Sequence, residues 1–313
     1  MKTTVSQVWK TVACVAAMAS LAGWVRAADE PVKDAPYENS LGMKFVPIPG
    51  TKVLFSIWDT RVKDYAAFTN ANPGKKLGGT TTNTVANKHI YKFPVSPEET
   101  CPVVLVSWED AKDFCAWLTE KEQKEGRLVA GQEYRLPTDA EWSIAAAPQG
   151  YFIWGDQWPP PAGAGNFNDG TLYARTGTHS FISQYENPYP EGSPNRGNSA
   201  KPWSDGWVAT SPVGSFAANK YGLYDMAGNV LQWCEDLYTP SDTNARVLRG
   251  SSWLVNCGPG EQLYGGRVLL MSGRHPTRES WRSEPMVGFR CVLVSRTAAQ
   301  ERPTKVPALL ATA

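Results

Sequence analysis

The sequence is poor in the residue types on which many hydrolytic sites depend. It has three histidines, His89, His179 and His275, which are far apart and never at the i, i+4 spacing of a helical zinc site. It also has no Gly-x-Ser-x-Gly motif of the kind that presents a nucleophilic serine. The sequence therefore predicts neither zinc hydrolysis nor serine-hydrolase chemistry.

An excess of charge of either sign is also missing. Thirty-one Lys and Arg against 30 Asp and Glu give a formal net charge of +1. Removing the first 27 residues, a predicted leader with Lys2, Lys10 and Arg26, takes this to about −2. A nearly neutral domain offers no electrostatic basis for binding nucleic acid or an anionic membrane, so we predict neither partner.

Long apolar runs are scarce, and the longest lies near the N-terminus. Residues 1–27 combine a basic start, an apolar stretch over 12–24 and a small-residue cleavage site ending at Ala27. The alternative is a membrane anchor, but the uncharged run over 11–25 is shorter than the ~20 residues of a comfortable bilayer span. We therefore predict a signal peptide, export to the periplasm or the exterior, and no membrane span once the leader is removed.

What the chain does contain is Trp, Gly and Pro, at 13, 27 and 24 residues, a composition that favours a loop-rich fold with aromatic side chains filling irregular gaps. Apolar spacing predicts helices after caps at Thr60, Ser107 and Thr138. Residues 39–49 read as an edge strand because prolines interrupt them, and residues 103–106 as a short buried strand.

Eight short blocks occur in an order that resembles the formylglycine-generating enzyme (sulfatase-modifying factor) family. They are residues 103–118, 135–142, 152–155, 165–166, 212–215, 221–233, 247–253 and 288–290. The resemblance implies an α+β fold related to C-type lectins, with little regular secondary structure, over residues 39–294. Residues 1–27 are then the signal peptide, 28–38 a linker and 295–313 a disordered tail.

The resemblance also implies two calcium ions in the loop-rich half, because calcium takes hard oxygen ligands that such loops supply. The implied ligands of the first are Asn166, Phe167, Asp205 and Trp207, and those of the second are Asp225, Gly228, Val230 and Gln232. Asp225 and Gln232 stand where the family usually has Asn and Glu, so the single carboxylate has changed sides and the ligand charge is kept. The alternative is that Asp205 and Asp225 are turn and capping residues.

Five cysteines follow the leader, an odd count that leaves at least one thiol free or paired elsewhere. The resemblance implies a disulfide between Cys115 and Cys291. Active family members hold copper(I) on two cysteines after the Gly-Ser-aromatic block, but this chain has only Cys257 there, so copper is not expected. Cys257 is the single catalytic candidate; otherwise it is a loop thiol or pairs with Cys101 or Cys234.

The predicted function is binding of an extended peptide or a glycan in a groove, because aromatic and Arg side chains suit both ligands. The proposed lining is Trp233, Arg249, Trp253, Arg267 and Arg274, although Trp233 and Trp253 are equally compatible with the core. One alternative is a formylglycine-generating-type oxidase that matures sulfatases by acting on a peptide cysteine, or another family oxidase using Cys257. Another is a structural module of an exported assembly. The sequence leaves the oligomeric state open.

Overall fold

The computed structural model describes residues 31–80, 84–86, 89–91, 93–150, 152–157, 160–167, 171, 204–254, 275–277 and 284–294. The predicted leader and tail lie outside the described residues, as do Cys257, Arg267 and Arg274. Among the described residues, the helices are too short or too polar to cross a bilayer.

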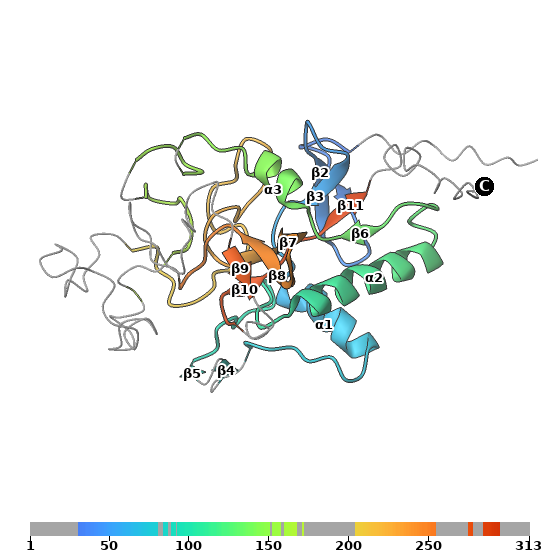
Figure 1. Cartoon of the computed structure of the whole chain (residues 1–313), viewed down its shortest axis with the longest axis horizontal. Helices are drawn as coiled ribbons and strands as arrows, with labels where there is room; N and C mark the ends of the chain where they lie inside the picture. Colours follow the sequence, from blue (N-terminus) through green and yellow to red (C-terminus); the bar gives the residue numbers. More distant parts are fainter. Residues whose placement is uncertain are drawn as a thin grey trace, which may run out of the picture. The chain divides into compact units, whose positions relative to one another are not determined.

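A five-stranded antiparallel sheet joins the beginning and the end of the domain (Figure 1). Its strand order is β1 (Tyr37–Glu38), β2 (Lys44–Pro47), β3 (Val53–Ser56), β11 (Val292–Val294) and β6 (Tyr134–Arg135). The prediction of an edge strand was wrong, since β2 lies between β1 and β3. Pro47 is tolerated because it is the last residue of the strand, where the ladder needs no further donor.

A second sheet of four strands contributes Gln232 to the candidate site. Its order is β10 (Val287–Gly288), β7 (Leu231–Thr239), β8 (Asp242–Arg249) and β9 (His275–Thr277), with β10 and β7 parallel. A separate hairpin pairs β4 (Thr84–Ala86) with β5 (His89–Tyr91). The mixture of short strands and few helices confirms the predicted α+β class.

The described residues form three helices beside these sheets: α1 (Val62–Ala71), α2 (Trp108–Lys124) and α3 (Asp139–Ala146). In Figure 1, α1 lies beside α2, and α3 packs against β7 and β8. The caps at Ser107 and Thr138 are confirmed, and each forms a reciprocal capping box.

The first helix begins one residue later than predicted. The N-cap of α1 is Arg61 rather than Thr60, and the Asp64 carboxylate accepts hydrogen bonds from the backbone N–H and the guanidinium of Arg61. Asp64 thus satisfies the Arg61 N–H, as the acids Asp110 and Glu141 do for the caps of α2 and α3, but a guanidinium cannot accept a hydrogen bond from the first turn of α1. The hydroxyl of Thr60 therefore gave a misleading cap signal.

Residues 103–106 form no strand, so that prediction was wrong, although Val103, Val104 and Val106 are buried. Leu105 has φ of 62°, a left-handed conformation that a branched aliphatic residue adopts only under strain and that interrupts an extended ladder. Leu105 packs against the apolar cluster around Trp253, whereas Val103 and Val106 join the main core beneath α2.

Candidate functional site

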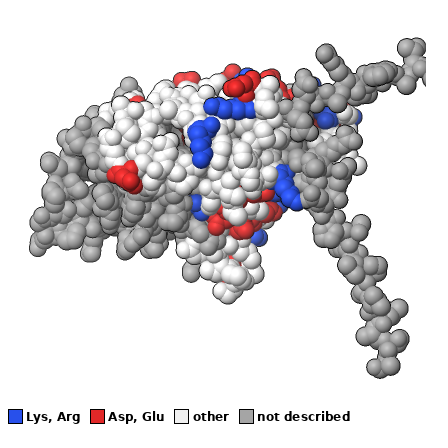
Figure 2. Space-filling model, turned by 90° about the horizontal axis from the view of Figure 1, so that it is seen from above, with Lys and Arg blue, Asp and Glu red and all other residues white. Residues whose placement is uncertain are grey.

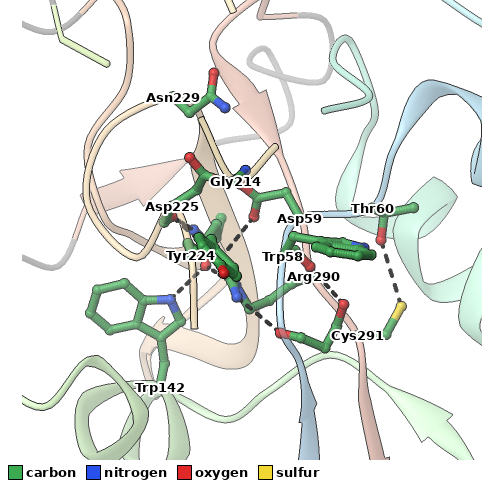
Figure 3. A network of polar contacts seen from close by, with 12 residues as sticks. Trp58, Asp59, Thr60, Trp142, Gly214, Tyr224, Asp225, Asn229, Arg290 and Cys291 are labelled. Carbon is green, nitrogen blue, oxygen red and sulfur yellow. Dashed lines mark hydrogen bonds and ion pairs between the residues drawn. The ribbon is translucent and has the colours of Figure 1, made fainter. Parts of the chain in front are cut away.

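The centre of the candidate site is the fully buried guanidinium of Arg290, on the connection between β10 and β11 (Figure 3). Arg290 donates hydrogen bonds to Gln232 Oε1 at 2.8 Å, to the Ser56 carbonyl at 3.0 Å and to the Tyr224 carbonyl at 2.8 Å. One side chain therefore ties both sheets to the loop that precedes β7.

Two buried carboxylates lie beside this guanidinium. Asp59 Oδ1 accepts a long bond of 3.4 Å from Arg290 Nη2, and Asp225 Oδ2 accepts one of 2.8 Å from the Gly214 N–H. The second oxygen of each acid, Asp59 Oδ2 and Asp225 Oδ1, is buried without a hydrogen-bond partner. Burial raises the pKa of Asp59 well above its usual range and also raises that of Asp225, although Arg290 opposes both shifts.

The side chain of Gln232 is not available to a metal ion, which corrects its assignment as a calcium ligand. Its Oε1 accepts hydrogen bonds of 2.8 Å from both Trp142 Nε1 and Arg290 Nε, and its Nε2 donates to the Asp225 carbonyl at 2.7 Å. An amide oxygen has two lone pairs, and both are in use. The sequence could not reveal this, because the two donors come from α3 and from the end of the domain.

The four residues of the first predicted calcium site lie together around the Asp205 carboxylate. Asp205 Oδ2 accepts a hydrogen bond from the Phe167 N–H at 2.7 Å, and Oδ1 accepts one from the Trp207 N–H at 2.9 Å. Asn166 is fully buried, its Nδ2 donates to the Ala209 carbonyl at 2.8 Å, and its Oδ1 has no hydrogen-bond partner. A fixed amide oxygen with free lone pairs beside a carboxylate fits the hard-oxygen chemistry of calcium.

The two predicted ion sites are in direct contact with each other. The Asn229 N–H donates to the Asn166 carbonyl at 2.7 Å, and the Asn229 side chain also bonds Asn166 Nδ2 and both backbone groups of Ser211. A Cβ on Gly228 would lie 2.5 Å from the Asn166 carbonyl oxygen, so only glycine fits there. Asn229, which was not predicted from the sequence, is therefore the residue that joins the two loops.

The donor sets of the two sites differ in how well they fit an ion. The first offers the unused Asn166 oxygen together with Asp205, and the second offers the unused Asp225 oxygen but not Gln232. No group of three or more His, Cys, Asp or Glu side chains that could hold a metal occurs in the part of the chain that the structure describes. Any ion there would depend largely on amide and carbonyl oxygens, as calcium can.

The three described residues of the predicted groove are core side chains, which corrects that assignment. Trp233, Arg249 and Trp253 are 3%, 3% and 2% exposed. Trp233 Nε1 donates to the Val106 carbonyl and Trp253 Nε1 to the Pro285 carbonyl, so both indoles have internal partners. Arg249 lies over the Trp142 ring and pairs with Asp139. Buried indoles fill the irregular interior that the composition predicted.

The described cysteines are all buried. The Sγ atoms of Cys115 in α2 and Cys291 lie 3.6 Å apart, near enough to be joined by a small side-chain rotation, so the disulfide stays a prediction with favourable geometry. Burial raises the pKa of Cys115 and of Cys101. Protonated interior thiols are poor metal ligands and poor nucleophiles.

Charged residues on the surface form no patch of one sign on the face seen in Figure 2, where Lys, Arg, Asp and Glu are scattered among uncharged residues. The ion pairs that the structure defines at the surface join neighbouring charges of opposite sign, such as Lys75 with Asp110 and Asp113, and Lys112 with Glu235.

Comparison with known proteins assigns the architecture. The family model of the sulfatase-modifying factor enzyme 1-like domain matches residues 55–294. "Inactive C-alpha-formylglycine-generating enzyme 2" of Bos taurus is 32% identical over 194 residues, covering 61% of this chain and 49% of its own. "Formylglycine-generating enzyme" of Mycobacterium tuberculosis is 36% identical over 214 residues, covering 61% and 56%.

The chain thus spans about half the length of the curated relatives it matches. Among solved structures, that of PvdO from Pseudomonas aeruginosa aligns with 78% of this chain and 80% of its own, at a TM-score of 0.46 and 22% identity.

Proposed function

Since the chain belongs to the sulfatase-modifying factor enzyme 1-like family, we propose that it is an exported member that keeps a calcium-stabilised scaffold and binds a peptide or a glycan without copper oxidase chemistry. The observation that carries this proposal is the cysteine inventory. Only Cys257 lies between the block that ends at Trp253 and the one that begins at Gly288, and a dithiolate copper site needs two thiolates. The four described cysteines are buried and are poor substitutes for the missing partner.

Calcium would hold the loop-rich half in this proposal. Asn166 and Asp205 would bind one ion and Asp225 the other, with carbonyls of the same loops completing the ligand sets. When bound, such an ion supplies charge neutralisation and cross-links loops; it takes no part in a reaction. The close contact between Asn166 and Asn229 would transmit the stabilisation from one loop to the other.

The proposed ligand-binding face does not include the buried indoles of Trp233 and Trp253. Leu105, Val208 and Met286 are partly exposed and pack against the cluster around Trp253. Because Leu105 is also strained, and backbone strain concentrates at functional sites, this rim is the better candidate for ligand contact. Arg267 and Arg274, outside the described residues, stay candidates for polar contacts.

A second candidate function is formylglycine generation itself. Relatives that carry the name "Formylglycine-generating enzyme", at up to 36% identity among those compared, favour it. The inactive relative of similar identity favours the binding module. Cys257 would be the thiol on which any remaining oxidase chemistry depends.

One experiment separates these functions. The calcium-loaded protein is incubated with copper(I), oxygen and a peptide carrying a sulfatase-type cysteine motif, and formylglycine is sought by mass spectrometry, with Cys257→Ser as the matched variant and an active formylglycine-generating enzyme as the positive control. We expect no conversion by either form. Turnover that disappears in Cys257→Ser would replace the binding proposal with the oxidase.

The binding and calcium parts have their own tests. Peptide and glycan arrays probed with the calcium-loaded protein should give ligands whose signal falls in Leu105→Asp. Chelation should lower the melting temperature of the wild type but have a smaller effect on Asn166→Ala. A melting temperature that does not change with chelator, in a protein found to contain no calcium after purification, would contradict the calcium scaffold.

A further inference from the structure

The buried charges around Arg290 do not balance. Asp59 and Asp225 are 0% and 5% exposed, and the guanidinium of Arg290 bonds the Asp59 carboxylate and the backbone carbonyl of Asp225. With both acids ionised, the cluster carries a net charge of about −1 in the interior, where an uncompensated charge is costly.

Arg290, moreover, donates most of its hydrogen bonds to neutral oxygens. Its shortest hydrogen bonds, of 2.8–3.0 Å, go to Gln232 Oε1 and to the carbonyls of Tyr224 and Ser56. Its contact with Asp59 is 3.4 Å, and with Asp225 it touches only the backbone carbonyl, at 3.3 Å. The guanidinium therefore anchors loops more than it neutralises either carboxylate.

Asp59 Oδ2 and Asp225 Oδ1 are buried, and neither accepts a hydrogen bond of normal geometry. Burial raises the pKa of Asp225 and the neighbouring amide of Asn229 opposes this shift, whereas among the described residues no such amide acts on Asp59. Buried carboxylate oxygens are normally bonded, because an unmet acceptor there carries the full desolvation cost. Asp59 Oδ1 and the Asp225 backbone carbonyl both accept a hydrogen bond from Arg290 Nη2, so the two residues are neighbours in Figure 3, and the negative charge of Asp225 adds to burial in raising the pKa of Asp59.

We propose that Asp59 is the second carboxylate of the second calcium position, taking over the role that the family resemblance gave to Gln232. This inference rests on the proposed calcium scaffold and changes its ligand set. Asp59 and Asp225 supply the two negative charges, while Gln232 acts as a positioning residue that holds Arg290 and the Asp225 carbonyl. The ligand charge is then raised relative to a site with Asp225 alone, which favours tighter binding of calcium.

The competing occupant is a proton shared between the two acids, which would also remove the excess charge. The two occupants differ in what they predict for the number of bound ions. A proton leaves one calcium per chain, at Asn166 and Asp205, whereas calcium at the second position makes two.

The test measures calcium bound to the full-length mature chain after chelation, by isothermal titration and by metal analysis, with near-UV circular dichroism as the check of folding. Asp59→Asn keeps the side-chain size and an acceptor for Arg290. Asp64→Asn is the matched control, because Asp64 is also a buried acid beside an arginine but both its oxygens are bonded by Arg61. Asp59→Glu restores the charge.

We expect two ions in the wild type and in Asp64→Asn. In Asp59→Asn one ion should be lost or bound at least roughly tenfold more weakly, and Asp59→Glu should recover part of the affinity. Two ions with unchanged affinity in Asp59→Asn would overturn this assignment and leave the calcium scaffold intact.

The assignment would also be overturned, in favour of the proton, if the wild type bound a single ion and Asn166→Ala abolished that binding. This second test does not depend on the folding of an Asp59 variant. No ion at all in the wild type would overturn the calcium scaffold together with this inference.

Discussion

Gly228→Ala is the substitution whose effect follows most directly from the structure. Gly228 has φ of 81°, and an added Cβ would lie 2.5 Å from the Asn166 carbonyl oxygen, 2.9 Å from the Asn166 nitrogen and 2.9 Å from the Phe167 ring. The residue is therefore opposed both by its backbone conformation and by its neighbours. The nearest of these neighbours are backbone atoms, which cannot move aside as a flexible side chain does.

The size of the effect is the sum of two contributions. A non-glycine residue in the left-handed region costs about 1–2 kcal/mol. Forcing a methyl group into a filled interior costs about 1–3 kcal/mol more. We therefore expect Gly228→Ala to lower the free energy of unfolding by ~2–5 kcal/mol.

Gly126→Ala is the matched control. Gly126 also has a positive φ, of 71°, but a Cβ there would meet no atom within 4 Å. It should lower the free energy of unfolding by about 1–2 kcal/mol. Denaturant unfolding followed by tryptophan fluorescence measures both values. Equal losses in the two variants would refute the argument, because the close packing of Gly228 on Asn166 would then contribute nothing.

Three further predictions concern other parts of the molecule. In oxidised protein, mass mapping should find Cys115 linked to Cys291, whose Sγ atoms are 3.6 Å apart; full alkylation of both thiols without reductant would contradict this. Tyr134→Phe removes a 2.8 Å hydrogen bond to the buried Glu122 carboxylate and should cost about 1.5–3 kcal/mol in chemical denaturation, a loss that an exposed tyrosine would not show. Burial raises the pKa of Glu141, but the two 2.7 Å bonds from Arg135 outweigh it and hold that pKa below its ordinary value. The stabilisation is therefore present at neutral pH and lost as the pH falls through the folded-state pKa, so the difference in unfolding free energy between wild type and Glu141→Gln should shrink between pH 7 and pH 3; a constant difference would count against it.

Local sequence signals predicted the parts of the fold that local physics decides. The caps at Ser107 and Thr138 were found because a hydroxyl and an acid three residues later satisfy the first turn by themselves. The cap of α1 was missed because its N-cap residue, Arg61, is not a capping type and forms an ion pair with Asp64. Residues 103–106 were misread because apolar composition does not reveal the left-handed backbone of Leu105.

For the candidate site, the sequence predicted only which loops contain the polar residues, and not the contacts that those residues make. The calcium ligands Asn166, Asp205 and Asp225, which the resemblance implies, stay predictions. Gln232 was assigned by position, and the sequence does not show the two donors that use its oxygen. Asp59 escaped notice because it lies 231 residues from Arg290, and nothing near it in the sequence marks it as buried. Long-range polar contacts are the part of a site that a single sequence does not contain.

The network around Arg290 also explains how a member of this family could lose copper chemistry and keep its fold. Among the described residues, Arg290 and Gln232 donate to the carbonyls of Tyr224 and Asp225 in the loop before β7, and Ser56 and Asp59 in turn hold Arg290. These residues all lie outside the segment after Trp253 where the thiol pair is expected. Changes in that segment therefore leave these bonds in place. If calcium binds Asp225 as proposed, its removal would also affect Arg290, which bonds the Asp225 carbonyl and the Ser56 carbonyl in β3. Calcium removal should then reduce the stability of the five-stranded sheet as well as that of the loops.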